Sequence, residues 1–303
     1  MNMVRLERTF WAVGHGAFYT EQFVDHNTDQ YFTAVYDCGG KGIKKSVDDF
    51  LRNVKRNGNG KPCVDFLFIS HFHYDHINGV QELINRANVK YIVVPQLTQK
   101  LLIEAYAYNA IQFDGTLDRE DLMQITDVQR FVVRLATQRD NIEVPIVEVL
   151  PSENEINTDK VLTLGENVGL EATWNSGQPI GVRYSGEDNN KHLIWLYIPV
   201  NVQYDNTFAD EIIAILKKKY SNLFAENSSV DWNQLQEVFK DTQTKKDIKK
   251  IYKEHFGSHN AYSMPVFSGP AVTTNKRVHT WCDLEIDNRT NTHLHMHCFN
   301  CES

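Results

Sequence analysis

The sequence has no long hydrophobic run, no excess of basic residues and few cysteines. No apolar stretch approaches the roughly 18 residues that a membrane-spanning helix needs, and residues 1–8 lack the hydrophobic centre of a signal peptide. The formal net charge of −8 argues against general affinity for nucleic acids through bulk charge. Internal repeats and low-complexity segments are also missing. We therefore expect a soluble cytoplasmic protein that does not bind membranes.

The five cysteines are odd in number and scattered, which indicates reduced thiols rather than a disulfide framework. Cys38 and Cys63 lie in apolar segments and are expected in the core. A chain of 303 residues with 42% hydrophobic residues is large enough for a substantial core. We expect one domain, residues 1–303, that carries a helical insertion at 206–256, because strand character resumes after this Lys-rich helical stretch.

The hydrophobic pattern alternates between strands and helices in the first hundred residues, as in α/β proteins. Further along, the pattern predicts a long helical stretch at 97–139, where Leu101, Ala105, Tyr106 and Asn109 share a face. The expected strands cover 7–14, 31–37, 63–69, 89–94, 146–150, 170–174, 192–198 and 262–267, and the expected early helices cover 44–57 and 79–86.

Four residues with metal-binding side chains follow the apolar segment 64–69 within six positions: His71, His73, Asp75 and His76. Imidazole nitrogens and carboxylate oxygens are preferred ligands of Zn²⁺. On extended backbone, His71 and His73 leave the same face of the chain. Asn78-Gly79 and a new apolar period come next, so the loop leads into a helix. The pattern predicts a metal site at the end of a strand.

This motif resembles the His-x-His-x-Asp-His signature of the metallo-β-lactamase fold superfamily. The glycine-rich segment 11–18, the segment 35–40 with its Asp-x-Gly turn, and the apolar segment 89–95 are similar to the superfamily's other early elements. The resemblance implies an αββα sandwich and metal-dependent hydrolysis. It implies that His71 and His73 bind one metal ion, that Asp75 and His76 bind a second, with Asp75 essential for catalysis, and that Asp37 orients a ligand from behind.

The segment 259–270 contains Asn260-Ala261-Tyr262-Ser263, which looks like the Asn-x-x-Ser strand of the competence-type and nuclease-like branch. That likeness implies a phosphodiester or nucleotide substrate and a zinc-activated water, although Mn²⁺ or Fe could bind the same ligands. Nucleic acid is a further candidate substrate, against which the acidic charge argues. The likeness also suggests a group of uncharacterised bacterial hydrolases, some associated with phage-defence loci.

Two later motifs of this branch, a strand ending in Gly-Asp and a Pro-His-His-Gly-Ser-like loop, are absent. We therefore expect a fold that is incomplete at its C-terminus, and weak metal binding, because each ion keeps two protein ligands where three are usual. A variant that completes its site differently is the competing explanation. A second class of function then stays open, that of an inactive fold member with a binding or regulatory role.

Other histidines could complete the site. His15, between two glycines, could contact substrate or serve as a structural turn residue, and His192 could be an additional ligand although it precedes a buried strand. The tail 292–298 alternates with period two and would place His293, His295 and His297 on one strand face. Whether that face has a physiological metal role stays open at this point.

Overall fold

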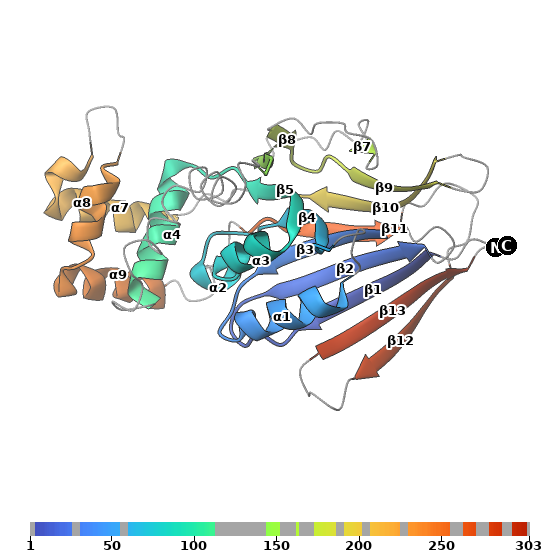
Figure 1. Ribbon diagram of the computed structural model, residues 1–303. Helices are drawn as coiled ribbons and strands as arrows, with labels where there is room; N and C mark the ends of the chain where they lie inside the picture. The colour runs from blue at the N-terminus through green and yellow to red at the C-terminus, as the bar shows by residue number, and fades with distance from the viewer. Residues whose placement is uncertain are drawn as a thin grey trace.

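The structure is a computed structural model. It describes residues 4–25, 31–54, 60–112, 144–151, 162–163, 173–185, 191–201, 207–224, 230–254, 263–270, 279–286 and 293–301. Two β-sheets pack face to face, and helices cover the outer face of the larger sheet (Figure 1). The mixed α/β architecture expected from the sequence is thereby confirmed.

The larger sheet is antiparallel at one end and parallel at the other. The parallel half begins at the β3–β4 pair. From there to the end of this half, each strand lies next to the one that follows it in sequence, except that β7 belongs to the smaller sheet. In spatial order its strands are β12 (His279–Ile286), β13 (His293–Cys301), β1 (Val4–Trp11), β2 (Phe18–Asp25), β3 (Tyr31–Cys38), β4 (Cys63–Phe68), β5 (Asn88–Pro95), β6 (Ile146–Leu150) and β8 (Thr173–Asn175).

The smaller sheet lies across the larger one. Its strands, in order, are β11 (Val266–Pro270), β10 (Lys191–Pro199), β9 (Ile180–Ser185) and β7 (Leu162–Thr163). Every residue of β4 is buried because this strand has a packed layer on both faces. Phe66 and Phe68 belong to the core between the sheets, whereas Leu67 and Ile69 belong to the core beneath the helices.

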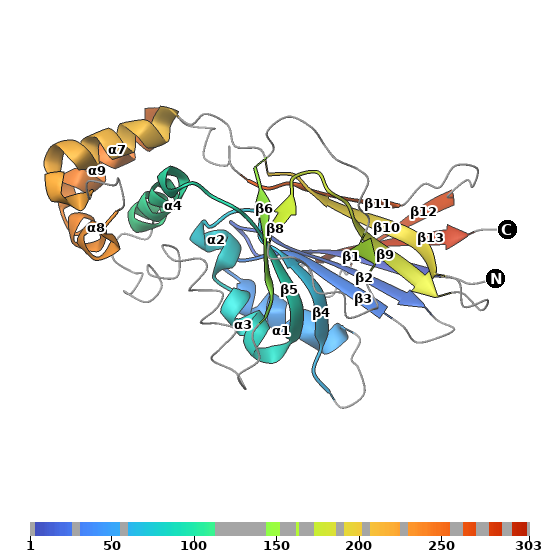
Figure 2. The same ribbon diagram turned by 90° about the horizontal axis from the view of Figure 1, so that it is seen from above.

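The helices form two groups. The first comprises α1 (Ile43–Asn53), α2 (Tyr74–Ile77) and α3 (Val80–Arg86). The second stands beyond one end of the sandwich, next to α2, and has a hydrophobic core of its own (Figures 1 and 2). It comprises α4 (Gln99–Gln112), α7 (Thr207–Lys219), the short helix η1 (Ser221–Leu223), α8 (Trp232–Val238) and α9 (Thr242–Glu254). None of the helices in the described segments has both the length and the apolar character to cross a bilayer.

Several expected elements agree with the structure, and others were missed. The described parts of 206–256 are mainly helical, as expected, but α4 packs with them, so the helical group also recruits residues from the first half of the chain. The strands β2, β9 and β12 were not predicted, and residues 113–139 of the expected long helix lie outside the described residues. The division into a single domain with an insertion stays a prediction.

The tail forms two strands instead of the single one expected. β12 and β13 pair antiparallel, and β13 then pairs with β1. The register sets His293 opposite Trp11 and His297 opposite Glu7. The tail therefore extends the larger sheet at its antiparallel end. The expected incompleteness of the fold is not decided by this pairing.

Candidate metal centre

The loop that carries the four motif residues begins where β4 ends. Ile69 donates its N–H to the carbonyl of Val93 on β5, at 2.8 Å, and the carbonyl of Ser70 accepts the N–H of Met264, also at 2.8 Å. The second bond ties the loop to the segment that leads into β11 of the other sheet. The motif therefore lies at one edge of the sandwich, held from both sheets, where the carboxyl ends of parallel strands commonly carry functional side chains.

A buried carboxylate, Asp37, organises the loop from the end of β3. Its Oδ1 accepts the Ser70 N–H at 2.7 Å, and its Oδ2 accepts the Ser70 hydroxyl at 2.7 Å. The same Oδ2 lies 2.8 Å from Nδ1 of His76. Asp37 has a φ of 55°, a left-handed conformation that Asp and Asn adopt more readily than most residues. This conformation aims the carboxylate at the loop.

The same network fixes the orientation of His71. The Ser70 hydroxyl gives its proton to Asp37 and therefore accepts from His71 Nδ1, 2.8 Å away. The Ser263 hydroxyl lies 3.2 Å from the same nitrogen. With Nδ1 protonated, the lone pair of His71 is on Nε2, as a metal ligand requires.

The pKa values of His71 and His76 are shifted in opposite directions, because the two rings differ in burial and in their contacts with charged groups. Burial, followed by the effect of His76, lowers the pKa of His71 well below its ordinary value of 6.5, so this ring is neutral. Burial also lowers the pKa of His76, but the hydrogen bond and charge of Asp37, together with the charge of Asp75, outweigh it and raise the pKa. A cation at His76 Nε2 would therefore compete with a proton.

Asp75 lies at the open side of the site. Its Oδ2 is 3.7 Å from Nε2 of His76 and 3.3 Å from Nε2 of His15, whose side chain is 85% exposed. His15 thus stands at the mouth of the site, next to the predicted catalytic carboxylate. Whether it contacts substrate stays a prediction.

Two glycines allow the chain to approach Asp75 closely. A Cβ on Gly16 would lie 2.2 Å from the carbonyl oxygen of Asp75, and one on Gly39 would lie 2.3 Å from the same atom. Such distances are far below van der Waals contact, so neither position accepts a larger residue without moving the loop. The glycine-rich segments noted in the sequence therefore position the metal motif itself.

His73 is held by the helical group. Its ring stacks on Tyr108 of α4, with ring centroids 3.8 Å apart and planes 15° apart. Asn109, fully buried on the same helix, donates to the carbonyl of Phe72 at 3.0 Å and accepts the N–H of Tyr74 at 2.7 Å. The side-chain amide of Asn109 therefore forms hydrogen bonds with the backbone on both sides of His73.

The imidazole rings of His71, His73 and His76 are packed closely together. The ring centroid of His71 is 4.5 Å from that of His73 and 4.0 Å from that of His76. Among the described residues, no three His, Cys, Asp or Glu side chains are arranged to hold one metal ion. The donor set nevertheless fits zinc chemically, because three imidazoles and a carboxylate meet in one place and two imidazoles have their Nδ1 atoms tied from behind. The assignment of these residues as ligands stays a prediction.

The backbone position of His192 places it away from this site. His192 lies near the beginning of β10, opposite Tyr184, whereas the opposite end of that strand, at Pro199, approaches the segment before β11. With about 3.3 Å per residue, this separation amounts to roughly 20 Å. The placement gives no support to a ligand role for His192. The side chains of His293, His295 and His297 lie outside what the structure describes.

Sequence reasoning missed the residues that support the motif: Ser70, Tyr108, Asn109 and Ser263. Ser70 adjoins the motif, and Ser263 closes the Asn-x-x-Ser segment, so both had a signal in the sequence. Tyr108 and Asn109 had none. They look like ordinary residues of a buried helix and reach the motif only through the tertiary fold.

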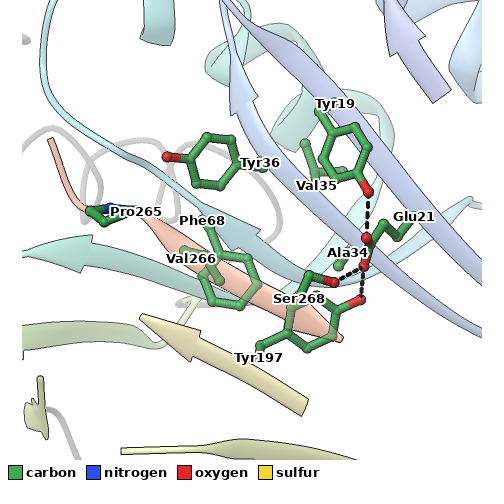
Figure 3. A pocket seen from close by; sticks show the side chains of 10 residues that line it. All are labelled: Tyr19, Glu21, Ala34, Val35, Tyr36, Phe68, Tyr197, Pro265, Val266 and Ser268. Carbon is green, nitrogen blue, oxygen red and sulfur yellow. Dashed lines mark hydrogen bonds between the residues drawn. The ribbon is translucent and has the colours of Figure 1, made fainter. Parts of the chain in front are cut away.

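A cavity of about 270 Å³ lies between the sheets (Figure 3), and no histidine is among the residues that line it. Its walls are largely aromatic and aliphatic, and Glu21 of β2 reaches it, buried at 1% exposure. The carboxylate accepts from the hydroxyls of Tyr197 and Ser268, each at 2.6 Å, and from that of Tyr19, and it pairs with Arg8 Nε at 2.9 Å. These donors come from both sheets, so Glu21 ties the sandwich together.

Comparison with known proteins agrees with this geometry. Residues 30–168 match the family model described as the metallo-beta-lactamase superfamily, a range that contains Asp37 and all four residues of the metal motif. No curated protein matches the chain significantly. Since the matched range, the two facing sheets and the histidine loop at their edge point the same way, the resemblance to the metallo-beta-lactamase superfamily inferred from the sequence is confirmed.

Proposed function

We propose that this chain is a metal-dependent hydrolase that acts on a phosphodiester or nucleotide. One observation supports this above others: the Asp37 carboxylate ties Nδ1 of His76 directly and Nδ1 of His71 through Ser70. This arrangement leaves the Nε2 atoms as the nitrogens that would hold a cation, beside the Asp75 carboxylate. Such preorganisation serves ligation better than packing, because buried histidines in an ordinary core need no shared carboxylate.

His71, His73, Asp75 and His76 would hold zinc, with Mn²⁺ or Fe as alternatives. When bound, a zinc ion activates water as a nucleophile and stabilises negative charge on the substrate. The chain's own contribution is to fix the imidazole tautomers and to keep the site dry on the side of Phe72 and Tyr108, both buried. His15 would contact the substrate from the exposed side.

Metal content and turnover test the proposal together. Elemental analysis after dialysis should find zinc below one equivalent per chain, because two of the superfamily's ligand motifs are absent. Zinc-supplemented protein should hydrolyse bis-p-nitrophenyl phosphate, and Asp75→Asn should abolish this activity. Glu82→Gln on α3, which removes a part-buried carboxylate that pairs with Arg86, is the matched control and should leave the activity unchanged. Zinc binding without any hydrolysis would contradict the enzymatic proposal.

A second candidate function is a binding or regulatory role without turnover. It is favoured by the missing Gly-Asp and histidine motifs and by the lack of a three-donor arrangement in the described residues. In that case the Asp75→Asn protein should bind a nucleotide as well as the unaltered chain does, in calorimetry with and without EDTA. Metal-dependent hydrolysis of the nucleotide by the unaltered chain, lost in Asp75→Asn, would contradict this role.

A further inference from the structure

We propose that α4 is a positioning arm for the metal site, in which Tyr108 and Asn109 set the place of His73. The inference rests on the proposed metal-binding function and deepens it, because it assigns part of the site's geometry to the helical group. Tyr108 and Asn109 are adjacent in sequence, and together they hold the ring and the backbone of the same histidine.

The contacts of Asn109 are directed at the loop rather than at its own helix. Its side-chain amide makes two hydrogen bonds, to the carbonyl before His73 and to the N–H after it, as a neighbouring strand would. At 0% exposure, a polar amide in a core is costly unless both its donor and its acceptor are used. Asn109 therefore holds the backbone of the loop at the point where it turns into α2.

Tyr108 defines the plane of the His73 ring. A tyrosine ring at 3.8 Å and 15° covers one face of the imidazole, which restricts ring rotation and leaves the ring edge, where the nitrogen lone pair lies, available to a metal ion. Ring contact with His71, at 4.5 Å, limits it from another side. The aromatic contact with Tyr108 therefore contributes directly to the orientation of the His73 ring.

The arm is itself braced by α9. The ring of Tyr252 meets that of Tyr108 edge-on, with centroids 5.5 Å apart. The Tyr252 hydroxyl donates to Oε1 of Glu104 at 2.8 Å and lies 3.0 Å from the Glu104 carbonyl oxygen. The path from α9 to His73 is thus a continuous set of packed rings. It makes the helical group a part of the site's support.

Two tyrosines on α4 provide a matched pair of variants. Tyr106 is also fully buried, but its ring packs against Phe239 in the helical core. Tyr108→Leu should weaken zinc binding about tenfold, as loss of a supporting contact behind a ligand does. Tyr106→Leu should lower the melting temperature at least as much while leaving the zinc affinity within twofold. Tyr108→Phe retains the ring and should restore the affinity.

The experiment is competition for zinc between each full-length variant and a chromophoric chelator, with thermal unfolding measured in parallel. Imidazole proton NMR of the protein prepared with EDTA gives an independent readout. The His73 ring protons should be shifted upfield by Tyr108 and return toward ordinary values in Tyr108→Leu but not in Tyr106→Leu. Asn109→Leu, which removes both backbone hydrogen bonds at similar volume, should also weaken zinc binding.

The outcomes separate the two proposals. If the unaltered chain binds no zinc, the proposed function fails, and the NMR arm still decides whether Tyr108 positions His73. If zinc binds but Tyr108→Leu and Tyr106→Leu weaken it equally, or neither does, the positioning role is overturned. An unshifted His73 in the unaltered protein overturns it as well.

Discussion

Two buried carboxylates, Asp37 and Glu21, occupy different parts of the same sandwich, and each is 1% exposed. Glu21 is balanced by the permanently charged Arg8 and by hydroxyl groups. Asp37 is bound by Ser70 and by His76, a group whose charge can change near neutral pH. The first arrangement suits a permanent tie between sheets. The second suits a site whose ligands must release protons when a cation binds.

The largest effect should come from breaking the structural carboxylate. Glu21→Ala leaves Arg8 and three hydroxyls without their common acceptor, and we expect the free energy of unfolding to fall by about 3–5 kcal/mol. Urea denaturation provides the measurement. Glu7→Ala on the adjacent strand removes a half-exposed carboxylate 3.7 Å from Arg5 and should change stability by no more than about 0.5 kcal/mol. Equal losses of unfolding free energy in the two variants would contradict the role of Glu21 in holding the two sheets together.

A steric change near Asp37 should be the next in size. Gly39→Ala forces a Cβ against the carbonyl of Asp75, and we expect a loss of about 1–3 kcal/mol together with weaker zinc binding, because the loop must shift. At Gly42, three residues on, a Cβ would meet its nearest atom at 3.6 Å, so Gly42→Ala is the control. Neither glycine has a positive φ, so the comparison isolates the close contact. Unaltered zinc affinity in Gly39→Ala would contradict the prediction.

Asp37→Asn should affect ligation more than folding. Asn tolerates the left-handed backbone of this position, but its amide cannot accept from Ser70 and His76 as the carboxylate does. We expect zinc affinity to fall about 10- to 100-fold. Chelator competition measures this change, and urea denaturation should show a smaller loss than that of Glu21→Ala. A variant with full affinity would show that Asp37 does not orient the ligands.

The pH dependence of stability should separate the two histidines that Asp37 serves. The pKa of His71 is lower in the folded chain than in the unfolded chain. Below pH 6.5 the unfolded chain therefore binds a proton that the folded chain does not bind, and the free energy of unfolding falls as the pH drops. The raised pKa of His76 contributes stability that is complete below 6.5 and is lost as the pH rises through its folded pKa.

Urea denaturation between pH 5.5 and 8 tests this in zinc-free buffer. Each group can contribute a slope of at most about 1.4 kcal/mol per pH unit. His71→Gln should reduce the slope of the unfolding free energy against pH at the acid end of this range, and His76→Gln should reduce the slope at the alkaline end. The assignment fails if either variant changes the slope at the opposite end instead.

The parallel strands and the clustering of the histidine motif at the end of β4 could be predicted because their signals in the sequence are local; the metal role of the motif stays a prediction. β4 is apolar apart from Asp65, and the four motif residues follow it within a few positions. β2 was missed because its inward face carries Glu21, a charge that only tertiary partners make acceptable in a core. β9 and β12 have short or mixed patterns that periodicity alone does not distinguish from loops.

The support of the site was beyond local reasoning for a related reason. The helix α4 is buried around most of its circumference, so its sequence shows no single polar face that would reveal two packing partners. Leu101 and Ala105 behaved as expected and are buried. The role of Asn109 could not be predicted, because its hydrogen bonds with Phe72 and Tyr74 join residues 35 to 37 positions apart in the chain.

The bracing of α4 by α9 also has a consequence for the order of events during synthesis. The contact between Glu104 and Tyr252 spans 148 residues, so at about 5–20 residues per second the ribosome delivers Tyr252 many seconds after the histidine loop has emerged. Until then α4 has a hydrophobic face without its partner helices. On the proposed positioning role of α4, the His73 part of the loop would reach its final geometry only after this late docking. Nascent chains released before α9 would therefore be expected to lack a competent site even though all four motif residues are present.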